Sequence, residues 1–271
     1  MFLLSFGIIA IVIALATGTE LPVPLVEFLD EYVRNDGTST DQYVALAFLV
    51  GMFAAISPGR LLLRYFSTVV HELGHAFMAG ALFARPKQIH IHPSSSGLAI
   101  YELSPNWGRF RASLVSAAGY PAQSIAAVAA IQAIQMGRSI AWAIFSVAVL
   151  SLAILLLIRN LWGIVWTSAV VGGCYYAFDK VSSDVVGAVV AGIAGFLVIN
   201  GVQFAWMQVT LVRRAPGSGV DAESIARFTR IPAGLIAWGH LVTCLGLGYI
   251  AGDLAIGPYW DSISEWIAEF Y

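Results

Sequence analysis

Long runs of apolar residues, separated by short polar segments, dominate the chain. A helix that spans a bilayer needs about 20 predominantly apolar residues, and most of the runs approach or exceed that length. The pattern therefore predicts an all-α polytopic membrane protein with about eight hydrophobic helices. The runs cover residues 2–17, 43–57, 61–84, 112–135, 139–158, 161–178, 185–209 and 233–256. The run 43–57 is short enough to be a re-entrant segment instead of a span.

Composition supports the same class of protein. Hydrophobic residues make up 59% of the 271 positions and charged residues 11%, whereas soluble domains carry about 25% charged residues. The net charge of −2, without any basic tract, argues against nucleic acid as a partner. The two cysteines, Cys174 and Cys244, both fall inside apolar runs, so neither a disulfide framework nor a zinc finger is expected.

Charged residues between the runs set the predicted orientation. Loop 210–231 carries four arginines, whereas residues 253–271 carry acidic residues and no lysine or arginine. Because positively charged loops stay in the cytoplasm, loop 210–231 is expected inside and the C-terminus outside. Counting back through the runs, the helix over 61–84 passes from outside to inside.

Two segments outside the long runs have recognisable patterns. In 86–103, isoleucines alternate with histidines, a "PSSSG" turn follows, and "LAIYEL" returns, which is typical of a small cytoplasmic β-hairpin. Residues 257–271 place apolar side chains at helical spacing opposite acidic ones, which predicts an interfacial amphipathic helix on the outer face.

The stretch "FSTVVHELGHAFMAG", residues 66–80, places ionisable residues inside an apolar helix. His71 and His75 are four residues apart, so their side chains stand on one face of a helix and can hold one metal ion. Glu72 can reach the water that such an ion keeps, which is the H-E-x-x-H arrangement of a zinc hydrolase. The alternative is a structural set of polar side chains satisfied by neighbouring helices. Ionisable residues within spans favour the functional interpretation.

A catalytic zinc ion needs a third protein ligand. Asp221 is favoured because its loop is expected on the same side as the cytoplasmic end of the HELGH helix, although the same position suits a helix N-cap. The other candidates are less well placed. Asp179 and Asp184 are expected on the outer side, and His90 and His92 on the hairpin. His240 lies inside the last span, where a hydrogen bond to a neighbouring residue is expected.

Several motifs together resemble the M50B-like branch of the site-2 protease (M50) intramembrane metalloproteases. They are "SPGRLLLRY", "STVVHELGHAFMAG", "KQIHIHPSSSG", "SAAGYPAQSI", "IRNLWG" and "VDAESIARFTRIP", spread over residues 58–256. The resemblance implies one zinc ion per chain held by His71, His75 and Asp221, with Glu72 as the general base. The N-P-D-G or L-D-G element of better-known members is missing here, and "VDA" at 220–222 is similar to the S-D-A element of this branch.

Three further features are expected beside the site. Asn160 begins a span near the cytoplasmic boundary, where it is a candidate catalytic residue that hydrogen-bonds substrate backbone or the oxyanion. The hairpin 86–103 is placed to pair an edge strand with an unwound substrate, or else to lie on lipid headgroups. Gly119 and Pro121, inside the run 112–135, predict a kink or a close helix contact.

The resulting expectation has three parts: N-terminal hydrophobic helices with an acidic loop (1–57), a site-2-protease-like core (58–256) and a C-terminal amphipathic helix (257–271). The function expected is a zinc-dependent endopeptidase that hydrolyses peptide bonds within or next to the transmembrane segment of single-span membrane proteins. The alternative is an inactive metal-binding or client-binding protein of the same fold. A multi-pass protein of a bacterial cell membrane, with its active site toward the cytoplasm, follows from the resemblance and the charge pattern.

Overall fold

The computed structural model describes residues 42–57, 60–102, 108–178 and 180–260. The expected first helix (2–17) and most of the expected C-terminal amphipathic helix lie outside these residues. Within them the chain is mainly helical, as the apolar runs predict. The helices are α3 (Gln42–Ile56), α4 (Arg60–Ala81), α5 (Arg109–Ala117), α6 (Gly119–Gln135), α7 (Ser139–Leu156), α8 (Leu161–Phe178), α9 (Ser183–Arg214), α10 (Asp221–Thr229) and α11 (Ala233–Ile256), followed by the 3-10 turn η1 (Gly257–Tyr259).

The described residues contain three helical stretches long and apolar enough to cross a membrane: Ser139–Leu156, Ser183–Arg214 and Ala233–Tyr259. The pair α5 and α6, bent by 51° at a short break, gives a fourth if it is one span. The protein is therefore a membrane protein, but the predicted count of about eight hydrophobic helices is not confirmed. The run 43–57 forms α3, which is shorter than these spans.

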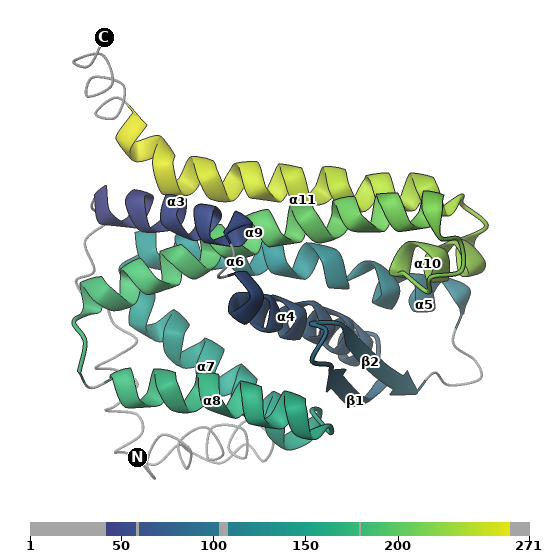
Figure 1. The fold of residues 1–271 in the computed structure, drawn as a ribbon, viewed down its shortest axis with the longest axis horizontal. Coiled ribbons are helices and arrows are strands. Elements are labelled where there is room, and N and C mark those ends of the chain that lie inside the picture. Colours follow the sequence, from purple (N-terminus) through teal and green to yellow (C-terminus); the bar gives the residue numbers. More distant parts are fainter. Residues whose placement is uncertain (1–41, 58–59, 103–107, 179, 261–271) are drawn as a thin grey trace.

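The long helix α9 is the centre of the bundle. Helices α3, α6 and α11 lie along it, and α10 sits at one end beside α5 (Figure 1). Buried apolar residues from these helices form the largest core cluster, which includes Phe48, Ile131, Ile134, Leu197 and Val198. Small residues let the backbones approach closely in this core, which is typical of helix contacts in membranes.

The predicted hairpin is confirmed. Strand β1 (Arg85–Ile91) pairs antiparallel with β2 (Gly97–Glu102). The other edge of β1 is also occupied: the Ile89 amide donates to the carbonyl of Leu157 (2.8 Å), and the Arg159 amide donates to the carbonyl of Ile89 (3.2 Å). The turn between α7 and α8 thus covers β1, so within the part of the chain that the structure describes the unpaired edge of the hairpin belongs to β2.

Helix α4 carries a polar stripe along one face, because residues three, four and seven apart stand nearly in line on a helix. One side chain of the stripe and one beside it hold the hairpin turn in place: Thr68 Oγ1 donates to the Ser95 carbonyl (2.8 Å), and the Tyr65 hydroxyl donates to the Pro93 carbonyl (2.5 Å). The polar stripe consists of Arg64, Ser67, Thr68, His71, Glu72 and His75.

The contact between α3 and α9 gives a stability prediction. A methyl group at Gly195 would collide with the Phe48 carbonyl, whereas one at Gly172 on α8 would meet no atom within 4 Å. Gly195→Ala should therefore lower stability by about 1–3 kcal/mol, the usual cost of overpacking. Gly172→Ala should leave stability unchanged or slightly higher. Thermal unfolding in one detergent measures both variants, and equal melting temperatures would contradict the packing seen here.

Candidate metal centre

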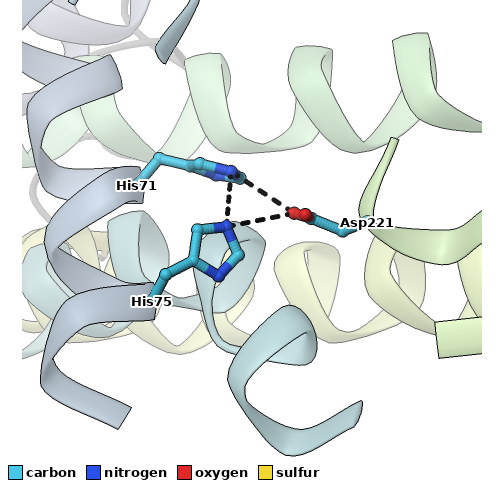
Figure 2. A group of neighbouring side chains, drawn as sticks. All are labelled: His71, His75 and Asp221. Carbon is cyan, nitrogen blue, oxygen red and sulfur yellow. Dashed lines mark hydrogen bonds and ion pairs between the residues drawn. The ribbon is translucent and has the colours of Figure 1, made fainter. Parts of the chain in front are cut away.

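Two distant segments bring three ligand-type side chains together. His71 and His75 lie on successive turns of α4, and Asp221 comes from α10. Figure 2 shows the three side chains pointing toward one another from these two helices. The two Nε2 atoms are 3.2 Å apart, and Asp221 Oδ2 lies 3.4 Å from His71 Nε2 and 3.3 Å from His75 Nε2.

These separations fit a zinc ion. Ligand bonds of about 2.0–2.1 Å in a tetrahedron place the ligand atoms roughly 3.3–3.4 Å apart, which matches the three distances. They are longer than the about 2.7–2.9 Å of direct charge-assisted hydrogen bonds. Asp221 Oδ2 is buried and has no hydrogen-bond partner of good geometry. The three atoms can therefore share a divalent cation and leave a fourth position open.

The orientation of His75 is fixed by the neighbouring helix. Its Nδ1 donates a hydrogen bond of 2.8 Å to the carbonyl of Val115, near the end of α5. A histidine that uses Nδ1 in this way presents the lone pair of Nε2, as ligands of metal ions usually do. The last turn of α5 thus supports one ligand directly.

Asp221 is the first residue of α10, and Val220 occupies the N-cap position. The alternative interpretation of Asp221 as an N-cap is therefore wrong, because no side chain caps this helix and the carboxylate turns toward the histidines. Burial on its own would raise the pKa of the Asp221 carboxyl, but the charge of His75 and the nearby His71 hold that pKa well below its usual range. The carboxylate is thus ready to bind a cation.

The loop before α10 is locked by Glu223. Its carboxylate accepts hydrogen bonds from the amides of Gly217 and Gly219, each 2.8 Å long. Both glycines have positive φ angles, +88° and +80°, which other residues rarely adopt. This turn leads directly into Asp221 and fixes where its helix begins.

Glu72 is buried, 5% exposed, on the helix that carries both histidines. Its carboxylate lies against β2: the backbone of Ala99 is close to it, and a side chain at Gly97 would overlap it. The imidazoles of His71 and His75 are close enough to interact electrostatically with this carboxylate. A buried carboxylate beside the three ligand atoms is well placed to accept a proton.

The start of α6 forms a wall of the site. A methyl group at Gly119 would come within 2.5 Å of His75 Nε2 and 2.6 Å of His71 Cε1, so both imidazoles pack on bare backbone. The Tyr120 ring meets the His71 ring edge-on, with centroids 4.8 Å apart. The kink predicted near Gly119 is confirmed by the 51° bend, and it lies beside the candidate metal centre.

The other candidates do not join the three ligand atoms. His240 is buried, donates from Nδ1 to Gln208 Oε1 (3.1 Å) and stacks on Tyr120. His90 bonds Gln88, and His92 is exposed on the hairpin. Asp184 lies in the first turn of α9, at the other end of that helix from Arg214, and Asp179 is outside the described residues.

Asn160 pairs with the hairpin. Its Oδ1 accepts from the Ile91 amide (2.9 Å), and its Nδ2 donates to the Ile91 carbonyl (2.5 Å). The side chain thus extends the pairing that the α7–α8 turn makes with β1. Its expected role toward substrate stays a prediction.

Sequence reasoning missed three supports of the site: the Val115 carbonyl, the Glu223 clamp and the contact between β2 and Glu72. The first is a backbone group, so no residue type marks it. Glu223 does have a signal, since it follows a glycine-rich loop and stands in the first turn of a helix. Gly97 follows a serine-rich turn and carries no separate mark.

Comparison with known proteins identifies a family. The sequence profile of the family described as Peptidase M50B-like matches residues 43–252, which include both histidines and Asp221. No curated protein and no solved structure matches the chain.

The contact at Gly119 gives a metal-binding prediction. Gly119→Ala forces both imidazoles to move, so zinc affinity should fall by roughly tenfold or more, as for other changes next to metal ligands. Gly239→Ala on α11, where a methyl group meets nothing within 4 Å, is the matched control. Competition with a chromogenic chelator measures both affinities. Wild-type affinity in the Gly119 variant would show that the ion binds elsewhere.

Proposed function

Because this chain belongs to the Peptidase M50B-like family and joins His71, His75 and Asp221 beside a buried glutamate, we propose that it is a zinc-dependent intramembrane endopeptidase. Its substrates are single-span membrane proteins, cut within or next to their transmembrane segment. The observation that carries the proposal is the tetrahedral spacing of the three ligand atoms next to Glu72.

The residues divide the chemistry between them. His71, His75 and Asp221 hold the zinc ion, which supplies Lewis acidity and lowers the pKa of water toward about 7. Glu72 accepts the proton of the attacking water and returns it to the leaving amine. The buried position of Glu72 against β2 keeps its carboxylate in one orientation.

The free edge of β2 is the proposed site for the substrate backbone. The backbone amides and carbonyls of Ile89 and Ile91 face the α7–α8 turn. The residues that alternate with them along β1, such as His90, therefore face β2 with their backbone groups. In this register Ala99, opposite Ile89, directs its amide away from β1 and toward Glu72. A peptide bond in a helix is shielded, and a locally unwound substrate needs partners for its backbone groups. Strand addition to β2 supplies them beside the glutamate.

The proposed sidedness follows from α9 and α10. The end of α9 carries Arg213 and Arg214, and the loop that follows leads to Asp221. Positively charged segments stay in the cytoplasm, so the metal centre faces that side. A bacterial cell membrane is the proposed location.

Replacing the base tests the proposal directly. Glu72→Gln should keep wild-type zinc content and lose cleavage by roughly 10²–10⁴-fold, the usual contribution of general acid–base catalysis. Quantitative membrane proteomics of the native host, with wild-type chain or Glu72→Gln, should show single-span proteins that accumulate uncut only in the variant.

The matched control is Asp184→Asn, an exposed carboxylate in the first turn of α9, at the other end of that helix from the loop that leads to Asp221. It should behave as wild type. If the proteome is the same with the wild-type chain and with Glu72→Gln, while deletion of the whole protein has a phenotype, the chain binds metal or clients without cutting them.

Strand addition to β2 predicts a periodic contact pattern. With Cys174 and Cys244 replaced by alanine, a cysteine at Ile100 in the Glu72→Gln background should form disulfides with single-cysteine substrates. The efficiency of disulfide formation should alternate with a period of two residues as the cysteine is moved along the substrate, because successive side chains of a strand face opposite sides. A period near 3.6 residues, or equal efficiency at all positions, would mean that the substrate does not pair with β2.

A further inference from the structure

Arg64 lies on the polar stripe of α4 and has no acidic partner among the described residues. Its guanidinium carbon lies 5.4 Å from the centroid of the Phe204 ring on α9. The side chain is half-buried, and its Nε is buried without a hydrogen-bond partner. Among the described residues, ion pairs form at the metal centre and between Lys87 and Glu102, and none involves Arg64.

The charge of Arg64 lies beside an apolar stretch of α9. Phe204 precedes Arg214, the last residue of α9, by ten positions, which is about 15 Å of helix. Helix α9 is one of the candidate membrane spans, and Phe204 belongs to its apolar run 185–209, so the guanidinium lies beside the apolar part of this helix. Arginine keeps its charge in proteins, and a cation at such depth is expensive and usually marks a functional site.

Arg64 is aligned with the metal ligands. It precedes His71 by seven residues, which brings it back to the same face of α4 about 10 Å away along the axis. An extended chain advances about 3.3 Å per residue, so this distance equals about three residues. Between the two residues the stripe is covered, because Ser67 bonds Asn200 and Thr68 bonds the Ser95 carbonyl. A substrate strand that passes the metal centre parallel to α4, outside these contacts, therefore brings its third residue from the cleaved bond level with Arg64.

We propose that Arg64 is a substrate-binding residue that holds an oxygen acceptor of the substrate about three residues from the cleaved bond. This inference rests on the proposed function and adds a substrate class to it. The planar guanidinium fork matches a carboxylate in two parallel hydrogen bonds, so a side chain of Asp or Glu at that position is the preferred ligand. The backbone carbonyls of an unwound substrate offer the same oxygen chemistry.

The contact with Phe204 shows how Arg64 is held ready. Cation–π attraction to the ring fixes the head of the side chain without using its hydrogen-bond donors. The donors thus stay available for the substrate. Helix α4 also has a separate link to α9, because Asn200 Nδ2 donates to Ser67 Oγ (2.6 Å). Loss of the Arg64 charge therefore leaves this polar contact between the two helices in place.

A charge-swap experiment tests the inference. Wild type, Arg64→Met and Arg64→Glu are reconstituted in liposomes with a single-span substrate that the wild type cuts. Glu, Gln or Lys is placed in turn at each of five positions on either side of the cleaved bond. Wild type should prefer Glu near the third position by about tenfold in kcat/KM, Arg64→Met should lose that preference, and Arg64→Glu should prefer Lys there.

The controls separate binding from folding. Arg138→Met, at the exposed turn between α6 and α7, should keep the wild-type preference. Phe204→Leu should lower the melting temperature and keep the sign of the preference. Zinc content should equal that of wild type in all variants, because Arg64 does not touch the ligands.

The outcomes are distinct. If Arg64→Glu prefers Lys where wild type prefers Glu, a substrate carboxylate is the group that Arg64 binds. If Arg64→Met raises KM equally for all substrates at unchanged zinc content, Arg64 binds the backbone carbonyls of the substrate. Unchanged KM and preference in Arg64→Met, or a loss of activity that follows only the melting temperature, overturns the inference. If the wild type itself cuts no substrate, the proposed function fails instead.

Discussion

Three potential ligand atoms, His71 Nε2, His75 Nε2 and Asp221 Oδ2, lie within 3.4 Å of one another, and the rest of the site depends on this close approach. Two imidazole nitrogens and a carboxylate oxygen at that spacing can share one cation, and the fold must hold them there. Val115 fixes His75, the bare backbone of Gly119 lets both rings approach, and Glu223 locks the loop that delivers Asp221. The bend between α5 and α6 and the short helix α10 both serve this convergence.

A second constraint is the cost of polar groups inside an apolar bundle. The structure concentrates them on one face of α4 and gives several of them a partner on another element: Ser67 meets Asn200, Thr68 meets the hairpin turn, and Glu72 meets β2. His240, which lies away from the ligand atoms, is satisfied by Gln208. Buried polar groups that are paired in this way cost little and orient the site.

Much of this arrangement is readable in the sequence, because it depends on local periodicity. The spacing of His71 and His75 predicts a shared face, and alternation around a turn predicts the hairpin. The charge of the loops predicts that Asp221 reaches the same side. What the sequence did not reveal depends on tertiary contacts: the pairing of Ile89 with the α7–α8 turn, the Val115 carbonyl and the number of helices that cross. Apolar runs alone do not distinguish a broken helix such as α5–α6 from one straight span.

Diffraction at the zinc absorption edge, from crystals of the wild-type protein grown with zinc, is the most direct measurement of the metal centre. An anomalous peak about 2.0–2.2 Å from His71 Nε2, His75 Nε2 and an Asp221 carboxylate oxygen is the predicted result. A peak that lacks Asp221 as a ligand, or no peak between α4 and α10, would contradict the convergence of these two helices on one ion. The proposed protease chemistry would then lose its structural basis.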